Sequence, residues 1–334
     1  MKKLLLLAAS LWLTLPGWAQ DSTRHAYAYF SLENDGFQIR AKDVTDRYFT
    51  NGVRVGMQST AGRRNPFRRL LLHLPASLES RPDHLYGFEI GQEIYTPRST
   101  SQRTPKLYPY DRPYAGYLFT SWSLVATDRV RATRLTSALT LGMIGPVSGA
   151  SEVQNGMHRH LKQKSAEGWV NQLRNDPVIS YSARWEARPF APIHPAFDLT
   201  ASVETTVGTL TNSLGLGGML RIGRFNDYFQ SASGMYDDDA SVPVRKIQVY
   251  AFVRPVFQSV LDNSLLGGGW LNGSRNYYAL PSVELEHFYW TTEYGWVAVL
   301  KNFRLALTQC YRGKEFRTGA EHYWGKISLT ARVR

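Results

Sequence analysis

The chain has 334 residues, a formal net charge of +12 and one cysteine, Cys310, which excludes an intrachain disulfide. The positive charge favours an anionic partner, such as nucleic acid or a phosphate-bearing lipid surface. The 19 tyrosines, 15 phenylalanines and 9 tryptophans are more typical of a membrane barrel with aromatic girdles than of a soluble enzyme.

The chain begins with a pattern that predicts export. Residues 1–3 are basic, residues 4–15 are apolar except for Ser10 and Thr14, and small residues follow. The apolar run is too short to span a membrane, so we expect a signal peptide over residues 1–19, cleaved after Ala19 or Gln20. The remainder, 20–334, is predicted to be one domain whose charge is 12 − 2 = +10 once Lys2 and Lys3 are lost. An exported protein rarely meets nucleic acid, so the expected partner is a phospholipid or lipopolysaccharide surface, with no nucleic acid.

After this start, apolar and polar residues alternate with period two along most of the chain. Tyr181 and Trp185 face one way, for example, while Arg184 and Glu186 face the other. The predicted strands are 25–33, 48–59, 84–95, 114–127, 131–145, 177–188, 195–208, 214–225, 245–258, 277–290, 295–308 and 323–333.

This alternation also fits a soluble sandwich, which would bury the apolar face. The signal peptide, the even strand count and the aromatic content instead favour an all-β fold, a twelve-stranded antiparallel transmembrane β-barrel with a short helix in an outer loop. If the amino terminus lies on the periplasmic side of the membrane, the outer loops are 34–47, 96–113, 146–176, 209–213, 259–276 and 309–322.

Two inner loops are longer than expected. Loop 60–83 contains Arg68, Arg69 and a run of leucines, which indicates either a basic segment at the membrane interface or a solvated charged loop. Loop 226–244 contains three consecutive aspartates from Asp237, for which an exposed acidic turn is favoured over a cation site.

Two outer loops carry the residues with the clearest chemical potential. In the first hairpin Asn34, Asp35 and Thr50 supply an amide, a carboxylate and a hydroxyl, although a turn would also use Asn and Gly. In loop 146–176, Gln154 and His158 are four apart and share a helix face, whereas His160 lies on another. His158 is a candidate general base, with a solvated or structural histidine as the alternative. Hard oxygen donors favour Ca²⁺ over zinc.

Together these segments resemble the outer-membrane lipid A 3′-O-deacylase family, twelve-stranded barrels that depend on calcium. The matching pieces extend over essentially the whole mature chain and comprise residues 33–35, 46–52, 92–95, 144–146, 152–155, His158, Arg159, Trp169 and 315–319.

The resemblance implies that His158 is the base that activates water, that Asn34, Asp35 and Thr50 organise Ca²⁺ and the scissile ester, and that Gln154 contacts the water or the substrate. It also implies that Arg103 meets a lipid A phosphate. Two departures affect the expected substrate range. Lys164 stands where a relative has an acidic residue, and the basic cluster is reduced to Arg103 between Gln102 and Thr104.

The expectation is thus a monomeric hydrolase of the bacterial outer membrane, with its active site on the outer-leaflet side, that removes the 3′ acyloxyacyl chain of lipid A in lipopolysaccharide. The alternatives are a porin-like or receptor barrel without enzymatic activity and a phospholipase barrel with a serine nucleophile. No Gly-x-Ser-x-Gly elbow supports the latter.

Overall fold

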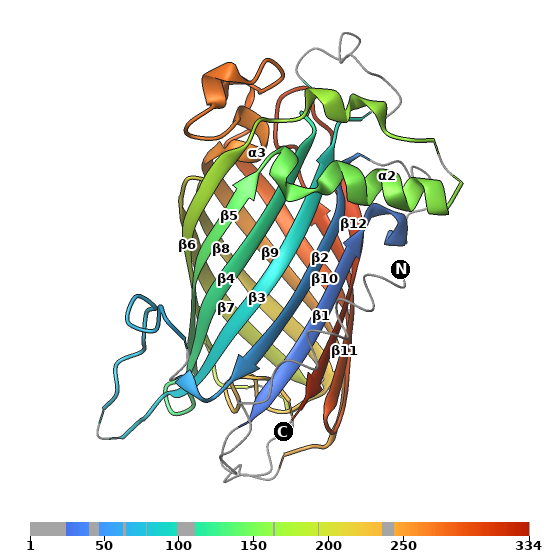
Figure 1. Cartoon of the computed structure of the whole chain (residues 1–334). Coiled ribbons are helices and arrows are strands. Elements are labelled where there is room, and N and C mark those ends of the chain that lie inside the picture. The colour runs from blue at the N-terminus through green and yellow to red at the C-terminus, as the bar shows by residue number, and fades with distance from the viewer. Residues whose placement is uncertain are drawn as a thin grey trace.

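The computed structural model describes residues 25–39, 47–62, 65–77, 79–98, 111–162, 164–192, 194–235 and 244–333. Over these residues the chain forms a closed antiparallel barrel in which each strand pairs with its sequence neighbours and β1 pairs with β12 (Figure 1). Closure pairs every sheet edge, as a lipid environment requires. The predicted fold class is therefore confirmed. The predicted signal peptide lies outside the described residues.

The strands are long enough to cross a bilayer when tilted. Their bounds are β1 Ala26–Asn34, β2 Tyr48–Ser59, β3 Asp83–Thr96, β4 Ala115–Asp128, β5 Thr133–Ile144, β6 Asp176–Ala187, β7 Phe197–Gly208, β8 Thr211–Arg224, β9 Ile247–Asn263, β10 Phe288–Leu300, β11 Phe303–Arg312 and β12 His322–Arg332.

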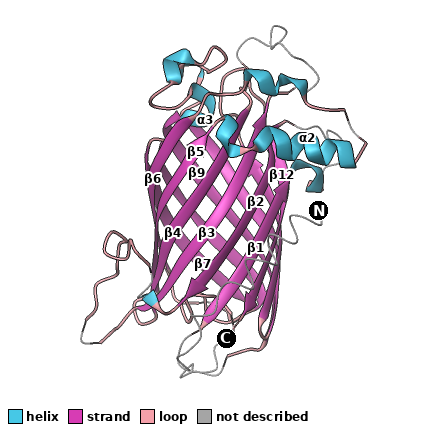
Figure 2. Cartoon of the chain, in the orientation of Figure 1, coloured by secondary structure: helices cyan, strands magenta, loops and turns pink. Residues whose placement is uncertain are grey.

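Helical elements are confined to the connections between strands (Figure 2). They are η1 Asp35–Phe37, η5 Pro146–Ser148, α2 Ala150–His160, η6 Glu167–Asn171, α3 Ser264–Gly267, η7 Gly273–Arg275 and η8 Ser282–Glu284. None of the helices in the described ranges combines the length and apolar character needed to cross a membrane. We call the end of the barrel that carries α2 the helix end, and the end at which β1 begins and β12 finishes the terminal end (Figure 1).

Two predicted strands were wrong. Residues 277–287 belong to the connection between β9 and β10, and the predicted strand 295–308 spans the second half of β10, a tight turn at Lys301 and Asn302, and the first half of β11. Glu293 and Gly295, which resemble a break in the sequence, lie within β10. Glu293 faces the lumen and pairs with Lys326, and Gly295 packs so closely on β11 that an added Cβ would lie 2.0 Å from the Leu307 carbonyl oxygen.

The alternation of side chains separates a polar lumen from an apolar outer wall. Arg184 in the lumen binds Glu204 on the neighbouring strand, while Trp185 and Val203 point outward with 43% and 40% of their surface exposed. The two faces are therefore assigned as the sequence pattern predicts for a membrane barrel.

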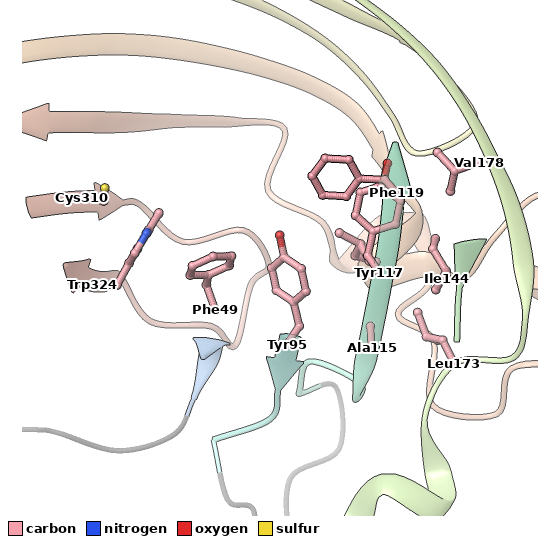
Figure 3. Packing of buried hydrophobic residues seen from close by; sticks show 11 residues of the cluster. Phe49, Tyr95, Ala115, Tyr117, Phe119, Ile144, Leu173, Val178, Cys310 and Trp324 are labelled. Atoms are coloured by element: carbon pink, nitrogen blue, oxygen red, sulfur yellow. The ribbon is translucent and has the colours of Figure 1, made fainter. Parts of the chain in front are cut away.

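Side chains and one loop fill the lumen. At the helix end the Phe49 ring packs against Tyr95 and Trp324, with ring centroids 5.3 and 5.0 Å away (Figure 3). Below this aromatic layer is a charged belt in which Arg54 binds both Glu33 and Glu93.

At the terminal end the loop after β8 folds into the lumen. Arg134 donates to the carbonyl oxygens of Tyr228 and Ser231, at 2.5 and 2.8 Å, and Met235 packs in the lumen against Tyr27 and Leu85. A cavity of about 560 Å³ separates this loop from the charged belt. The predicted acidic turn at Asp237 lies outside the described residues.

Candidate functional site

Four residues form a row across the outer wall of the barrel at the helix end, and we call it the polar row after its two asparagines. It consists of Asn34 in β1, Asn51 in β2, Ile94 in β3 and Gly116 in β4, which are directly opposite one another. Directly opposed residues point to the same face of a sheet, and Glu33 beside Asn34 faces the lumen. The row therefore faces outward, away from the lumen.

A β-bulge at Thr50 modifies this row. The register between β2 and β3 shifts between Phe49 and Asn51, which leaves Thr50 as the additional residue. A bulge redirects side chains, and here the Thr50 hydroxyl oxygen lies 2.8 Å from that of Thr96, which shares the outer face with Ile94. Thr50 and Asn51 are consecutive residues, and both are buried on the outer side of the wall.

The hairpin amide and carboxylate are held by local hydrogen bonds. The Asn34 Nδ2 donates to the Thr50 carbonyl oxygen at 3.0 Å, and its Oδ1 accepts from the Gly36 backbone at 2.8 Å. Asn34 therefore caps η1 and joins the two strands, leaving one lone pair on Oδ1. Asp35 is buried, and its Oδ2 accepts a bond from the Arg47 backbone at 3.3 Å.

Asn51 belongs to the polar row, and the sequence alone indicated no role for it. Its side chain is 6% exposed, yet its Oδ1 has no hydrogen-bond partner among the described residues. A buried acceptor without a partner is unfavourable unless a ligand, an ion or a water completes it. The family-matching segment 46–52 includes Asn51. The bulge that turns the Asn51 side chain to the outer face has no signal in the sequence.

Gly116 allows helix α2 to lie against the wall. An added Cβ at Gly116 would lie 2.1 Å from the Ser148 hydroxyl oxygen and 2.4 Å from the Ala150 Cβ. Beside it, Gln92 donates to the Ser148 carbonyl oxygen at 2.6 Å. The start of α2 is thus held on the outer face of β3 and β4.

One face of α2 is buried. Ala150, Gln154 and His158 are four residues apart and are the buried residues of the helix, whereas His160 is exposed. Ala150 packs in one cluster with Ile94 of the polar row. The predicted shared face of Gln154 and His158 therefore turns inward on a helix that lies on the outer wall, and Figure 1 shows α2 crossing the front of the barrel toward η1 in this view.

The chain returning from α2 fixes both side chains. Trp169 Nε1 donates to Gln154 Oε1 at 2.7 Å. Asn155 bonds the backbone of Ala166 in both directions, at 2.7 and 3.4 Å. His158 Nδ1 lies 2.7 Å from the carbonyl oxygen of Lys164. A carbonyl oxygen only accepts, so Nδ1 carries the proton and Nε2 carries the lone pair when the ring is neutral.

Arg103 lies outside the described residues, but both ends of its loop are described. Asp111 closes the loop, since its carboxylate accepts from the Arg98 and Arg112 backbones, each at 2.8 Å. Burial raises the pKa of Asp111, and these hydrogen bonds partly oppose that shift. Asp111, in the predicted outer loop 96–113, therefore acts in loop closure.

The donor set at the polar row is suited to a hard cation. The consecutive residues Thr50 and Asn51 supply a hydroxyl and an amide oxygen, and Asp35 in η1 of the same hairpin supplies a carboxylate. Oxygen ligands of this kind are typical of Ca²⁺. The described residues contain no group of three or more His, Cys, Asp or Glu that could hold a metal. Any cation here would need amide and hydroxyl oxygens in addition to the single carboxylate of Asp35, and the unpartnered Asn51 Oδ1 fits that role.

The comparisons with known proteins identify the family. A family model described as "Outer membrane protein LpxR" matches residues 5–333. The chain belongs to the LpxR family. A search of curated proteins gave no match. Among solved structures, LpxR from Salmonella typhimurium has a TM-score of 0.70 at 19% identity, covering 91% of this chain and 99% of that one. That likeness shows the fold, and the family model places the chain among outer-membrane proteins.

Two autotransporter domains also match at lower similarity. The β domain of Bordetella BrkA has a TM-score of 0.38 at 10% identity and covers 92% of this chain and 98% of its own. The NalP translocator domain of Neisseria meningitidis has a TM-score of 0.39 at 10% identity, covering 99% and 95%. These scores carry no argument about the LpxR-family site.

Proposed function

We propose that this LpxR-family protein is an outer-membrane ester hydrolase that removes the 3′ acyloxyacyl chain of lipid A with the help of Ca²⁺. The observation that supports it most is the placement of His158 and Gln154 on the buried face of a helix held against the outer wall, at the same end as the polar row. The helix end then faces the cell exterior, and the protein acts as a monomer.

The location of the site suits a lipid substrate. An amphiphile embedded in the outer leaflet reaches the outer wall by lateral diffusion and does not have to enter the lumen. The wall beside the row is apolar, since Leu118 and Val55 point outward with 39% and 37% exposure. Acyl chains can pack there while the ester is held among polar groups.

His158 is proposed as the general base. Its Nδ1–H bond to the Lys164 carbonyl fixes the ring and its tautomer, and in the neutral ring Nε2 is the nitrogen that would accept a proton from an attacking water. Gln154, held by Trp169, orients the water or the ester. Asn34 is proposed to position the hairpin through its bonds to Thr50 and Gly36, and Arg103 to meet a lipid A phosphate.

Asp35, Thr50 and Asn51 are proposed to hold the Ca²⁺, with Asn34 Oδ1 as a further ligand. When bound, the cation polarises the ester carbonyl. The arrangement of buried amide, hydroxyl and carboxylate oxygens supports this choice over zinc.

The porin-like alternative is less well supported. A channel needs an open lumen, whereas Phe49, Tyr95 and Trp324 fill one end and the loop carrying Phe229 and Met235 fills the other. The phospholipase alternative needs a serine nucleophile beside a base. Ser148, just before α2, donates its hydroxyl to the Gly145 carbonyl. Ser151, on α2 itself, is seven residues from His158, which is about two helical turns.

The test is lipid A hydrolysis by matched histidine variants. Purified barrel is incubated with lipid A and Ca²⁺, and the product is weighed by mass spectrometry. Wild type and His160→Ala are expected to release the 3′ chain, and His158→Ala is expected to lose about 10²- to 10⁴-fold in rate. Unchanged lipid A with wild type, or full activity in His158→Ala, would contradict the proposal.

A further inference from the structure

A segment of the long loop after β2 lies against the outer wall near the terminal end. We call residues 65–75 the wall segment. Leu71 of this segment packs on Leu124 and Ala126, which are 0% exposed although they are on the outward face of β4. The Phe67 ring contacts Trp122 with centroids 4.8 Å apart. The wall segment therefore occupies a strip of wall that would otherwise meet acyl chains.

Hydrogen bonds to outward-facing side chains fix the wall segment. The Leu72 backbone N–H donates to the Ser137 and Tyr181 hydroxyl oxygens, at 3.0 and 3.1 Å, and the Tyr181 hydroxyl donates to the Leu70 carbonyl at 3.0 Å. Arg131 donates to the Pro75 carbonyl at 3.2 Å. These contacts come from β5, β6 and the turn after β4, so the segment is attached along its length.

The side of the wall segment that faces away from the barrel is both apolar and basic. Leu70 and Leu72 are 60% and 46% exposed, and Arg68 and Arg69 are exposed between Phe67 and Leu70. Arg63 and Arg64 precede them in the sequence, and residues 60–78 contain no acidic residue. Basic side chains beside exposed leucines are typical of a segment at the boundary between acyl chains and anionic headgroups.

We infer that the wall segment binds the headgroup of an anionic glycerophospholipid in the leaflet at the terminal end. Leu70 and Leu72 contact the upper acyl chains, and the guanidinium groups of Arg68 and Arg69 bind the phosphate. With the helix end facing outward, this is the periplasmic leaflet. The lipid would bind the outer wall near the terminal end, whereas α2 lies at the helix end. It takes no part in ester hydrolysis.

The test is native mass spectrometry of the full barrel in detergent, titrated with phosphatidylglycerol or with phosphatidylcholine of the same chains. Wild type is expected to retain phosphatidylglycerol in preference to phosphatidylcholine. Arg68→Glu with Arg69→Glu is expected to lower the apparent affinity for phosphatidylglycerol about tenfold or more. Arg174→Glu with Arg317→Glu makes the same change in net charge on exposed residues of the helix end and is the matched control.

Retention of phosphatidylglycerol by the control, with loss in the wall-segment variant, supports the site. Equal retention of both lipids by wild type, no change in the wall-segment variant, or an equal decrease in both variants would overturn it. The electrophoretic shift between folded and heat-unfolded barrel reports folding of each variant. Since lipid A is absent from the assay, failure here is distinguishable from failure of the proposed hydrolase.

Discussion

Substitution of Asn51 tests whether its buried amide is a cation ligand or only an unsatisfied polar group. Its Oδ1 has no partner among the described residues, beside Thr50 and opposite Asn34. If the oxygen binds Ca²⁺, Asn51→Ala should weaken Ca²⁺-dependent activity about 10- to 100-fold. It should also abolish the rise in thermal midpoint that Ca²⁺ gives wild type, since a ligand that binds only the folded state stabilises it.

Asn226→Ala is the control for Asn51→Ala. Asn226 uses its amide in two hydrogen bonds to the Arg245 backbone at the terminal end, so its loss should leave the Ca²⁺ response intact. An Asn51→Ala barrel that is equally or more stable and still responds to Ca²⁺ would show that the amide is only an unsatisfied polar group.

Lys164 supports His158 through its main chain. The group that accepts from His158 Nδ1 is the Lys164 backbone carbonyl, and the Lys164 side chain is exposed. Lys164→Ala should therefore retain kcat/KM within about twofold and keep the pH profile. Asn155→Ala should lower kcat/KM about tenfold and alter the pH profile, because Asn155 ties Ala166 to α2. A large loss in Lys164→Ala alone would assign the role to the side chain.

At the residue scale, the sequence predicted the features that follow from the helical repeat, such as which side chains share a face. The spacing of Gln154 and His158 placed both on one helix face, and the exposed His160 lies elsewhere, as observed. It did not predict Asn51, because its outward direction depends on a bulge between two strands. Nor did it predict that a main-chain carbonyl supports His158, because carbonyl oxygens carry no residue-specific signal.

Among the elements, α2 depends on the glycine beneath it. Gly116→Val would place side-chain carbons where Ser148 and Ala150 now lie, so α2 should be displaced from the wall while the barrel stays closed. We expect a loss of activity of about 10²-fold or more, since small misplacements of reacting groups are costly. Faster tryptic cleavage at Arg159 would report the displacement independently of activity.

Gly156→Ala is the matched control on the same helix. The nearest atom to its added Cβ is an Arg159 guanidinium nitrogen at 3.9 Å, so nothing obstructs the methyl group. Replacing glycine by alanine in a helix stabilises it by up to about 1 kcal/mol, and this variant should remain active and resist trypsin. A Gly116→Val barrel with normal activity and normal cleavage would refute the seating of α2 on Gly116.

The strands themselves were largely predictable because each alternates over its whole length. The error at β10 has a specific origin. Glu293 resembles a loop residue until its ion pairs inside the lumen are known, with Arg254 on the adjacent strand β9 and Lys326 on β12. The residues 277–287 contain aromatic side chains typical of a strand, yet Leu280 and Leu285 instead pack with Tyr48 and Phe316 at the helix end. Both effects come from partners distant in the sequence.

For the whole molecule, the filled lumen and the outer-wall site are connected. Ion pairs and aromatic rings fill the lumen, and the proposed hydrolysis therefore uses the outer wall, which a lipid would reach laterally. The net charge of +12 agrees with this arrangement, since anionic headgroups are proposed at both ends: lipid A beside α2 and a phospholipid beside the wall segment.

The buried ion pair at the helix end predicts how the whole barrel responds to acid. Glu315, in the loop after β11, binds Arg112 and Arg312, and the Arg112 side chain is 0% exposed. Burial raises the pKa of Glu315, but the two guanidinium groups outweigh it and hold the pKa below its ordinary value of 4.5. The stabilisation from ionised Glu315 is therefore complete above pH 4.5 and is lost as the pH falls through the lower pKa of the folded state.

The thermal midpoint in detergent should consequently decrease as the pH is lowered below 4.5, the ordinary pKa of the glutamate carboxyl. Glu315→Gln should lower the midpoint at neutral pH, because it leaves Arg112 buried without its counter-charge, at a cost of about 3–5 kcal/mol. The variant should also have a smaller acid-dependent decrease than wild type. Glu79→Gln, at an exposed position of the opposite end, should reproduce the wild-type profile. Identical acid profiles for wild type and Glu315→Gln would mean that other carboxylates control the transition, and that the Arg112–Glu315 pair does not hold the helix end closed.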